Sequence, residues 1–576
     1  MKKKIISVED LTYIYPTKNE PSVRNINLDV FLGDFLLIVG PTGSGKSTLG
    51  MCLNGLIPHI LQGNLKGRVL IDGVDTREKT VAKLSTQVGL LFQDPDAQIF
   101  NLYGFDELAF GCENLGLPPE EIQRRISWVA KDLGLTDYLA TPVQELSLGL
   151  KQRIALASIL AMEPKILVLD EPTSNLDAYS VRSLVTMLKT LQNRYNITII
   201  VIEHDTDSFA DAANRIAVID NGRVVLQGTP NEVYLEKICY LQALGIKVPD
   251  LFCLINEIQR MHAGKPYDGN MSVDGVSDYI VSSCQIARCI CPENKKENKL
   301  KWQREHAPIL TVENLSIQSE DKHVLLHGIN ASFFPGETVA VIGANGVGKT
   351  MLFKTIAGLR IPTTGSIKLC GIDLLSMDPI EKARQIGFVF QEPDHQFIKE
   401  KVGEDMILAC SDFSSSYEEA VRHAKEILTN IGLLDYIESY IHKLSMGQRR
   451  MLSIATALKP GKRMIILDEP TIGLDFKAMQ KIIEMLKSIK NDSLSTIIIT
   501  HDLNFASLLC DRVIALAKGR IIYDGPISQL IEQEQLINSI KVLPPIPWLI
   551  YENLHSMRGI CLRPALTIPE LMDQFE

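Results

Sequence analysis

Two short segments of this chain fit the phosphate-binding pattern G-x4-G-K-[ST]. They are Gly40-Pro-Thr-Gly-Ser-Gly-Lys-Ser47 and Gly343-Ala-Asn-Gly-Val-Gly-Lys-Thr350. The glycines let the backbone turn so that successive N–H groups point at phosphate oxygens. The lysine supplies a positive charge to the β- and γ-phosphates of a nucleotide. The residues expected to contact ATP here are Gly40, Gly43, Gly45, Lys46, Ser47, Thr48, Gly343, Asn345, Gly346, Gly348, Lys349 and Thr350.

The same companion residues follow each loop in the same order. A glycine-rich turn that arose by chance would not be followed by the same companion residues at the same spacing. The chain is therefore a tandem duplication of one nucleotide-binding unit. Two fused copies suggest a working form in which the copies face each other. The pairs Lys46/Lys349, Gln93/Gln391, Glu171/Glu469 and His204/His501 are offset by 303, 298, 298 and 297 residues.

Side chains suited to Mg²⁺ and to water activation accompany both loops. A carboxylate after a buried strand and a loop hydroxyl are the ligands expected for the metal of a bound nucleotide. The metal candidates are Ser47, Thr350, Asp170, Asp468, Gln93 and Gln391. The glutamate after each aspartate points a different way along an extended chain and would polarise the attacking water. The histidine could hold the γ-phosphate and this water. The catalytic candidates are Glu171, Glu469, His204, His501, Gln93 and Gln391.

Each copy also contains a helix start with a serine at the cap position. The segments are Leu146-Ser-Leu-Gly-Leu150 and Leu444-Ser-Met-Gly-Gln448. A helix N-terminus with a free serine hydroxyl is a site for an anion. The nucleotide-contacting candidates in these segments are Ser147, Gly149, Ser445, Gly447 and Gln448.

Short apolar runs lead into these reactive residues, and such runs are typical of buried parallel strands. Reactive groups at the carboxyl ends of parallel strands indicate an α/β fold. A helix should follow each loop, over 47 to about 56 and 350 to about 359, and a helical insert should occupy about 103–160 and 400–458. The expected strands are 35–39, 88–92, 166–169, 197–202, 339–342, 386–390, 464–467 and 496–500.

Length and composition limit the possible architectures. A chain of 576 residues is too long for one hydrophobic core. The net charge of −10 argues against a nucleic-acid partner. The 11 cysteines favour reduced thiols in a cytosol. No stretch reaches the roughly 18 uninterrupted apolar residues of a membrane span. We expect two P-loop ATPase domains, each α/β with a helical subdomain, at 1–235 and 307–535, with a linker at 236–306 and a tail at 536–576 that packs on the second domain.

The order of phosphate loop, glutamine, Leu-Ser-x-Gly-x, apolar-Asp-Glu and histidine resembles the ATPase subunits of ABC transporters. The resemblance covers about 1–235 and 308–530. Within that family, three segments resemble the energy-coupling-factor ATPases of cobalt and vitamin uptake. They are Phe92-Gln-Asp-Pro-Asp-Ala-Gln-Ile-Phe100, Phe390-Gln-Glu-Pro-Asp-His-Gln-Phe397 and Phe110-Gly-Cys-Glu-Asn-Leu-Gly-Leu-Pro-Pro-Glu120.

This resemblance implies a head-to-tail ATP sandwich, an internal pseudo-dimer in which the loop of one unit meets the Leu-Ser-x-Gly-x helix of the other. It implies ATP hydrolysis with Mg²⁺ that drives uptake of a vitamin, a vitamin precursor or a transition-metal ion. The implied partners are a transmembrane coupling protein docked near each glutamine segment and a substrate-binding membrane protein. The implied location is peripheral, at the cytoplasmic face of the cell membrane.

Departures from the family pattern make the two copies unequal. The family signature is Leu-Ser-Gly-Gly-Gln, but Leu148 or Met446 stands at its third position and Leu150 at the fifth in the first copy. The aromatic residue that stacks on adenine would be Tyr15, and its counterpart is Ser319. The site built from loop 40–47 and signature 444–448 should therefore be the better ATP binder and hydrolyst.

Other classes fit less well. The main alternative is a soluble ABC-F-type translation factor, but its charged helical arm conflicts with a charge-balanced linker interrupted by Gly264, Pro266 and Gly269. A sugar-importer ATPase is not expected to carry the Asp/Glu-Pro-Asp-x-Gln segments. A DNA-repair or chromosome ATPase needs a coiled-coil or zinc insert. The linker residues Cys284, Cys289 and Cys291 lack a zinc-site spacing, so we expect ordinary thiols.

Overall fold

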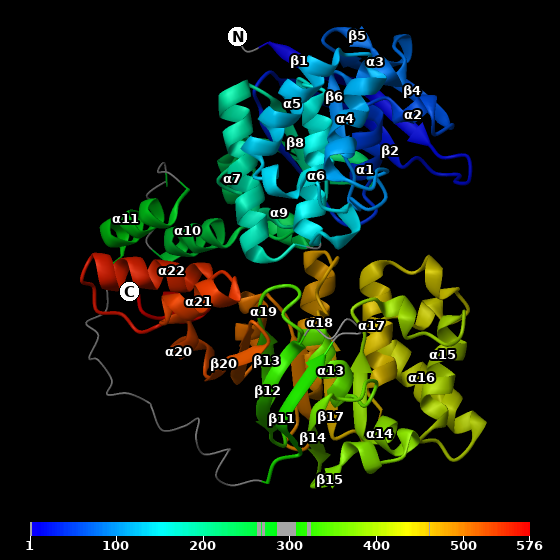
Figure 1. Ribbon diagram of the computed structural model, residues 1–576, viewed down its shortest axis with the longest axis vertical. Helices are drawn as coiled ribbons and strands as arrows, with labels where there is room; N and C mark the ends of the chain where they lie inside the picture. Colours follow the sequence, from blue (N-terminus) through cyan, green and yellow to red (C-terminus); the bar gives the residue numbers. More distant parts are fainter. Residues whose placement is uncertain are drawn as a thin grey trace. The chain divides into compact units, whose positions relative to one another are not determined.

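The computed structural model describes residues 3–174, 176–261, 267, 271–284, 307–318, 324–459 and 461–575. Contacts divide the chain into two compact units, Met1–Leu176 with Ser180–Asn256, and Asp177–Tyr179 with Glu257–Glu576. Each unit contains one four-stranded sheet, one six-stranded sheet and a helical insert (Figure 1). The expectation of two tandem α/β ATPase domains is confirmed.

The six-stranded sheet of the first unit has the strand order β10-β9-β3-β8-β7-β6. Strands β6, β7, β8, β3 and β9 are parallel to their neighbours, and β10 is antiparallel to β9. The central strands are buried along nearly their whole length because helices cover both faces, which is why the sequence shows continuous apolar runs. The bounds are β3 Phe35–Val39, β6 Val88–Leu91, β7 Ile166–Asp170, β8 Thr198–Ile202, β9 Arg215–Asp220 and β10 Arg223–Gly228.

The second unit repeats this sheet with the order β16-β17-β18-β13-β19-β20. Its pairing is the same: five parallel strands and one antiparallel edge strand, β20. The bounds are β13 Thr338–Ile342, β16 Ile386–Val389, β17 Met464–Asp468, β18 Ser495–Ile499, β19 Arg512–Ala517 and β20 Arg520–Gly525. Each expected strand is present within one or two residues of its predicted ends.

An antiparallel sheet of four strands accompanies each central sheet, in the orders β2-β1-β4-β5 and β12-β11-β14-β15. In the first unit, residues of β1, of β3 and of the helix after the phosphate loop share one hydrophobic core, so this helix lies between the two sheets. The second unit has the equivalent core. The bounds are β1 Lys4–Ile14, β2 Val23–Phe31, β4 Asn64–Ile71, β5 Val74–Asp75, β11 Leu310–Gln318, β12 Val324–Phe333, β14 Thr364–Leu369 and β15 Ile372–Asp373.

Helices follow the phosphate loops and form the inserts, as expected. The loop helices α1 Lys46–Leu53 and α13 Lys349–Ile356 end about one turn earlier than predicted. In the first unit Asn54 caps the end of α1, and Gly55, at φ 80°, precedes the separate turn α2 Leu56–His59. The insert helices are α4 Gly104–Asn114, α5 Pro119–Asp132 and α6 Leu148–Ala161, and α15 Val402–Ser411, α16 Tyr417–Asn430 and α17 Met446–Ala457. Other helices are α3 Val81–Ser85, α7 Ala178–Tyr195, α8 Thr206–Phe209, α14 Pro379–Gln385, α18 Phe476–Ile489 and α19 Leu503–Leu509.

The linker and the tail are largely helical where the structure describes them. Trp548 and Val542 of the tail share a core with Ile342 and Ala515, so the expected packing of the tail on the second unit is confirmed. The helices are α9 Ile238–Ala243, α10 Asp250–Met261 and α11 Val273–Ser283 in the linker, and α20 Ile527–Ile531, α21 Glu534–Ile540, α22 Ile546–Glu552, η9 Asn553–Met557 and α23 Ile568–Met572 near the C-terminus.

Linker helix α11 belongs to the second unit, where it packs against the tail. Asn553 donates to the carboxylate of Asp274 at 2.7 Å, and Arg558 pairs with Asp278. The linker positions Cys289, Cys291, Gly264, Pro266 and Gly269, and the adenine-side position Ser319, lie outside the described residues. Among the described helices, none combines the length and the apolar character needed to cross a membrane.

Candidate functional site

Each phosphate loop begins where a central strand of its six-stranded sheet, β3 or β13, ends. The ammonium group of Lys46 donates to the carbonyls of Gly40 and Pro41 at 2.8 and 2.9 Å. The same arrangement recurs in the second unit, where Lys349 donates to Gly343 and Ala344 at 2.7 and 3.1 Å. Both lysines are therefore held inside their own loops, on the side where phosphate oxygens would bind.

The loop glycine before each lysine cannot be replaced without strain. Gly45 has φ 100°, and a Cβ there would lie 2.3 Å from the carbonyl oxygen of Ser22. Its counterpart Gly348 has φ 97° and would meet the Leu326 side chain at 2.7 Å. Gly43 and Gly346 also have positive φ, 78° and 80°. This backbone requires glycine, as the phosphate-loop pattern predicts.

The loop hydroxyls lie beside the strand-end aspartates, which is the donor set of a magnesium site. Thr350 donates to Asp468 at 3.4 Å, and Ser47 is hydrogen-bonded to Asp170. Burial raises the pKa of Asp468 to about 6 and also raises that of Asp170. One oxygen of Asp170 is buried without a hydrogen-bond partner. A divalent cation would supply the missing partner, so these residues fit Mg²⁺.

Mg²⁺ needs few protein ligands when it is bound with a nucleotide. It usually keeps several waters and takes one or two carboxylates together with phosphate oxygens. In the part of the chain that the structure covers, no three His, Cys, Asp or Glu side chains cluster as a metal site. The hydroxyl and the aspartate of each unit would hold Mg²⁺, and Gln93 and Gln391 stay predicted ligands, with Gln93 donating to Glu171 at 2.7 Å.

In the first unit, the three predicted catalytic residues come together. Gln93 donates to one carboxylate oxygen of Glu171 at 2.7 Å, and Nε2 of His204 lies 3.1 Å from the other. Burial alone would raise the pKa of Glu171, but the hydrogen bond and charge of His204 outweigh it and the pKa is lowered. The carboxylate is thus ionised and oriented from both sides, as a group that polarises water must be.

The second unit brings together only two of the three. Nδ1 of His501 lies 3.1 Å from both oxygens of Glu469, and the charge of Glu469 raises the pKa of His501 although burial opposes this. The side chain of Gln391 has no hydrogen bond to another described residue. Its backbone carbonyl is instead held by Arg450. The first and second sites therefore differ in how the glutamine segment is placed.

Arg450 explains part of this difference, and the sequence analysis did not single it out. Its side chain is buried in α17, burial lowers its pKa to about 10, and it donates to the carbonyl of Phe390 at 2.6 Å. The equivalent residue of the first unit is Gln152, which donates to the carbonyl of Pro172. The sequence contains the signal, because Gln152 and Arg450 stand at equivalent positions, 298 residues apart, and differ in type.

Both candidate glutamates have a left-handed backbone, which the sequence analysis missed. The φ angles of Glu171 and Glu469 are 46° and 45°. The amide of Glu171 still bonds to the carbonyl of Ile202, so the chain turns at the strand end rather than continuing to alternate. This conformation costs free energy in a residue with a Cβ and is typical of functional sites. The turn, rather than strand alternation, separates the directions of Asp170 and Glu171.

The aromatic side chain proposed for adenine stacking lies next to the phosphate loop. The hydroxyl of Tyr15 is 3.2 Å from that of Thr48. Its ring packs edge-on against Tyr13, with centroids 4.8 Å apart. Tyr15 is partly exposed, and the ammonium group of Lys18 lies over its ring, 5.7 Å from the centroid.

The two signature helices begin differently. Ser445 accepts a hydrogen bond from the amide of Gln448 at 3.3 Å, and the Gln448 side chain accepts from the amide of Ser445 at 2.9 Å. This is a complete capping box. Ser147 also stands at a cap position but its side chain makes no capping bond, and Leu150, at the position of Gln448, has no side-chain acceptor for the reciprocal bond. Gly447 is tightly packed, since a Cβ would lie 2.6 Å from that of Ala478, whereas Gly149 has room.

We expect Ser445→Ala to lower the free energy of unfolding of the second unit by about 1 kcal/mol, because the cap bond is lost. For a unit of this size that is a fall of roughly 2–4 °C in Tm. Ser147→Ala is the matched control and should shift Tm by less than about 1 °C, since no cap bond is removed. Differential scanning calorimetry measures both. Equal shifts would show that the capping difference does not exist in solution.

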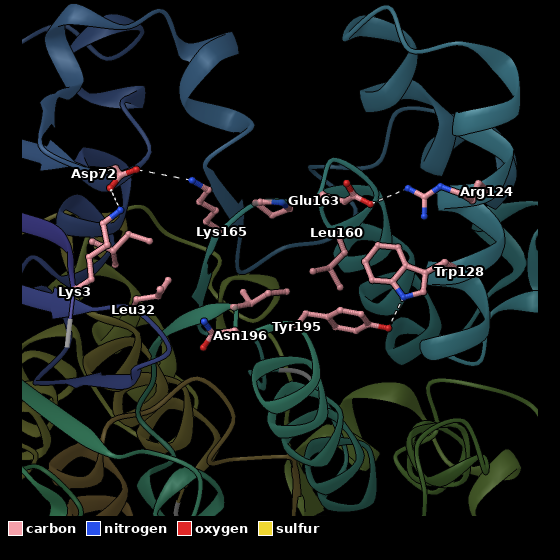
Figure 2. Close-up of a pocket in the computed structure, with 13 residues that line it drawn as sticks. Lys3, Leu32, Asp72, Arg124, Trp128, Leu160, Glu163, Lys165, Tyr195 and Asn196 are labelled. Carbon is pink, nitrogen blue, oxygen red and sulfur yellow. Dashed lines mark hydrogen bonds and ion pairs between the residues drawn. The ribbon is translucent and has the colours of Figure 1, made fainter. Parts of the chain in front are cut away.

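The first unit also has a cavity of about 560 Å³, whose lining includes Lys3, Asp72 and Trp128 (Figure 2). It borders Lys165 and Ile197, which precede the starts of β7 and β8, whereas the phosphate loop follows the end of β3. Its charged lining groups are paired among themselves, as in the contact of 2.6 Å between Lys3 and Asp72. The cavity is therefore at the opposite edge of the sheet and is not the nucleotide site.

The chain is similar in sequence to proteins of a known family. The family model for ABC transporters matches residues 23–174 and 326–472. A Methanosarcina acetivorans protein, provisionally named an ABC transporter ATP-binding protein, is 34% identical over 98% of this chain and 93% of its own length. Bacillus subtilis YkoD, provisionally named an HMP/thiamine import ATP-binding protein, is 32% identical over 95% of this chain and 97% of its own. The solved structure of cbiO1 from Clostridium perfringens, described as part of the ABC transporter complex cbiONQ, is 36% identical over 44% of this chain and 99% of that one, with a TM-score of 0.38.

Proposed function

This chain belongs to the ABC transporter family of ATPases, and on that premise we propose that it is the energy-coupling subunit of a membrane importer for a micronutrient. The substrate class is a vitamin, a vitamin precursor or a transition-metal ion. The energy-coupling-factor resemblance of the glutamine segments supports this class. The provisional name of YkoD, a relative of similar length, supports it as well.

In this proposal the chain's own residues divide the work of ATP hydrolysis. Lys46 and Lys349 neutralise charge on the β- and γ-phosphates, and the signature serines stabilise the transferred phosphoryl group. When bound, Mg²⁺ would neutralise negative charge on the phosphates, and Ser47 with Asp170 or Thr350 with Asp468 would hold it. Glu171 and Glu469 orient and polarise the attacking water, and His204 and His501 hold each glutamate in place.

One observation carries the membrane part of the proposal. Each unit has a large apolar side chain exposed to solvent at the C-terminal end of its glutamine segment, Phe100 at 79% exposure and Ile398, the next residue after the segment, at 78%. The two positions are equivalent, offset by 298 residues. An exposed large hydrophobic side chain at the same place in both copies is typical of a binding surface rather than of scatter.

A buried carboxylate holds each of these exposed residues in position. Glu107 accepts from the amides of Phe100 and Asn101 at 3.1 and 2.9 Å. Asp405, the equivalent residue, accepts from the amides of Ile398 and Lys399 at 2.8 and 2.9 Å. A fixed backbone reduces the conformational entropy lost when a partner binds. The loops are therefore built to present an apolar side chain.

The surroundings of both residues suit an apolar element of a partner. In the second unit, Ile398 borders a groove of about 500 Å³ that is also lined by Leu359, Phe388 and Leu408. In the first unit, the ring of Phe100 lies 6.4 Å from that of Phe110, and Leu102 and Phe105 are exposed nearby. An amphipathic helix of a membrane protein fits such a groove. We propose that a transmembrane coupling protein docks at these two surfaces.

The test is affinity purification of the tagged chain from mildly solubilised native membranes, followed by mass spectrometry. We expect a polytopic coupling protein and a small hydrophobic binding protein with the wild-type chain. The double variant Phe100→Ser/Ile398→Ser should recover the coupling protein at least about 10-fold less, because buried apolar anchors dominate interface energies. Its ATPase activity as isolated protein should be unchanged.

Tyr417→Ser is the matched control, since Tyr417 is also an exposed aromatic residue, at 73%, but starts α16 outside the groove lining. It should recover partners as the wild type does. Equal recovery with the double variant would contradict docking at Phe100 and Ile398. Recovery of ribosomes from the soluble fraction, with no membrane protein, would favour the ABC-F-type translation factor instead.

A further inference from the structure

A buried carboxylate directly precedes the candidate catalytic histidine of the first unit. Glu203 follows β8 and is only 3% exposed. Its amide donates to the carbonyl of Ile38 at 3.1 Å, which fixes its backbone beside β3. Burial raises the pKa of Glu203 to about 8, with the neighbouring Asp205 adding to the rise and hydrogen bonds from Thr173 opposing it. Burying a carboxyl group removes it from water, which costs free energy unless hydrogen bonds in the protein replace those with water.

The carboxylate is used to join two segments of the chain. One oxygen accepts from the amide and the hydroxyl of Thr173 at 2.8 and 2.5 Å. The other accepts from the amides of His204 and Asp205 at 3.0 and 3.5 Å. All of these donors belong either to Thr173 or to the segment that directly follows Glu203.

These two segments are the ones that carry the candidate catalytic pair. Thr173 lies two residues after Glu171, and His204 contacts the Glu171 carboxylate at 3.1 Å. The contacts close a ring from Glu171 through Thr173, Glu203 and His204 back to Glu171. Within this ring, Glu203 contacts no residue of the phosphate loop and no candidate metal ligand. It acts on the reaction only through the groups that it holds.

The second unit lacks this device. The residue equivalent to Glu203 is Thr500, whose hydroxyl accepts from the amide of Asp502 at 3.1 Å. The imidazole of His501 faces its glutamate through Nδ1, whereas His204 uses Nε2. The histidine is thus presented differently in the unit without the carboxylate.

We propose that Glu203 is a positioning residue for ATP hydrolysis in the first unit, where it fixes the backbones of Thr173 and His204 and so orients the Glu171–His204 pair. The inference rests on the hydrolytic role proposed for that pair. Positioning of this kind matters because a displacement of about 1 Å can cost on the order of 100-fold in rate. It also gives the first unit a support that the second does not have.

The test uses the full chain with one site silenced at a time. In a Glu469→Gln background, we expect Glu203→Thr, which installs the residue of the second unit, to lower kcat by about 10- to 100-fold. Assayed above pH 8, where Glu203 is ionised, Glu203→Gln should do the same, because its amide group would face N–H donors that need an acceptor. The dissociation constant of ATP, measured on the same samples, should change less than about 2-fold, since the phosphate loop is untouched.

The reciprocal background separates positioning from a general structural role. In Glu171→Gln, adding Glu203→Thr should leave the remaining turnover of the second site unchanged. An unchanged kcat in the Glu469→Gln background would overturn the inference, as would joint loss of kcat and ATP binding. If Glu171→Gln alone leaves turnover intact, the role proposed for Glu171 fails instead.

Discussion

Glu171→Gln is expected to lower the ATPase turnover of the chain by on the order of 100-fold, whereas Glu469→Gln should lower it no more than about 2-fold. The structure gives a reason for this inequality. Glu171 is held by both Gln93 and His204, but Glu469 is held by His501 alone. A water-polarising carboxylate works best when its orientation is fixed before the transition state is reached.

The nucleotide side of the two sites adds to the same inequality. Tyr15 lies beside the first phosphate loop and is partly exposed. Loss of base stacking could cost about 1–3 kcal/mol of ATP binding by analogy with stacked bases elsewhere. The second loop has Ser319 at the position aligned with Tyr15. A first site that binds ATP more tightly is occupied more of the time, and it would therefore also hydrolyse more ATP.

The measurement is steady-state ATPase activity of the two single variants with saturating ATP and Mg²⁺. Gln differs from Glu by one group and keeps the side-chain shape, so folding should be preserved. ATP affinity, measured by titration, serves as the control and should remain within about 2-fold in both variants. Equal losses of turnover in Glu171→Gln and Glu469→Gln would count against the asymmetry.

The strands, loops and insert helices could be predicted from the sequence because their patterns are local. A continuous apolar run such as Phe35–Val39 is fully buried in the centre of a parallel sheet, and glycine at positions 45 and 348 is required by φ near 100°. The register of the duplication then placed the aspartate, glutamate and histidine at neighbouring strand ends.

Other features depend on contacts between distant segments and had no local signal. The left-handed backbone of Glu171 needs surroundings that hold it, since glutamate does not favour that conformation. The failure of Gln391 to reach Glu469 accompanies the binding of its backbone carbonyl by Arg450, 59 residues away. In the sequence, Glu203 is only the residue that follows an apolar strand. Its contact with Thr173 forms only when the chain is folded.

The double variant Glu171→Gln/Glu469→Gln should bind ATP and fail to hydrolyse it, with turnover lowered by on the order of 1000-fold or more. All phosphate-loop residues, hydroxyls and aspartates remain in this variant, so the groups that hold the triphosphate and Mg²⁺ are intact. Only the two carboxylates that polarise water are lost. ATP should then persist in both sites, and the protein should be trapped in the closed, ATP-bound state implied by the family resemblance.

Rapid desalting after incubation with labelled ATP and Mg²⁺ measures the trapped nucleotide directly. The retained label should be ATP, and adding Lys46→Ala and Lys349→Ala to the double variant should abolish retention, because the charge beside the β- and γ-phosphates is removed. Undiminished ATPase activity in the double variant would refute the roles of both glutamates. Retention of ADP instead of ATP would show that another group activates the water. Retained ATP together with lost turnover would show that opening of the protein depends on ATP hydrolysis. Hydrolysis is then the step that a transport cycle must couple to the membrane partner.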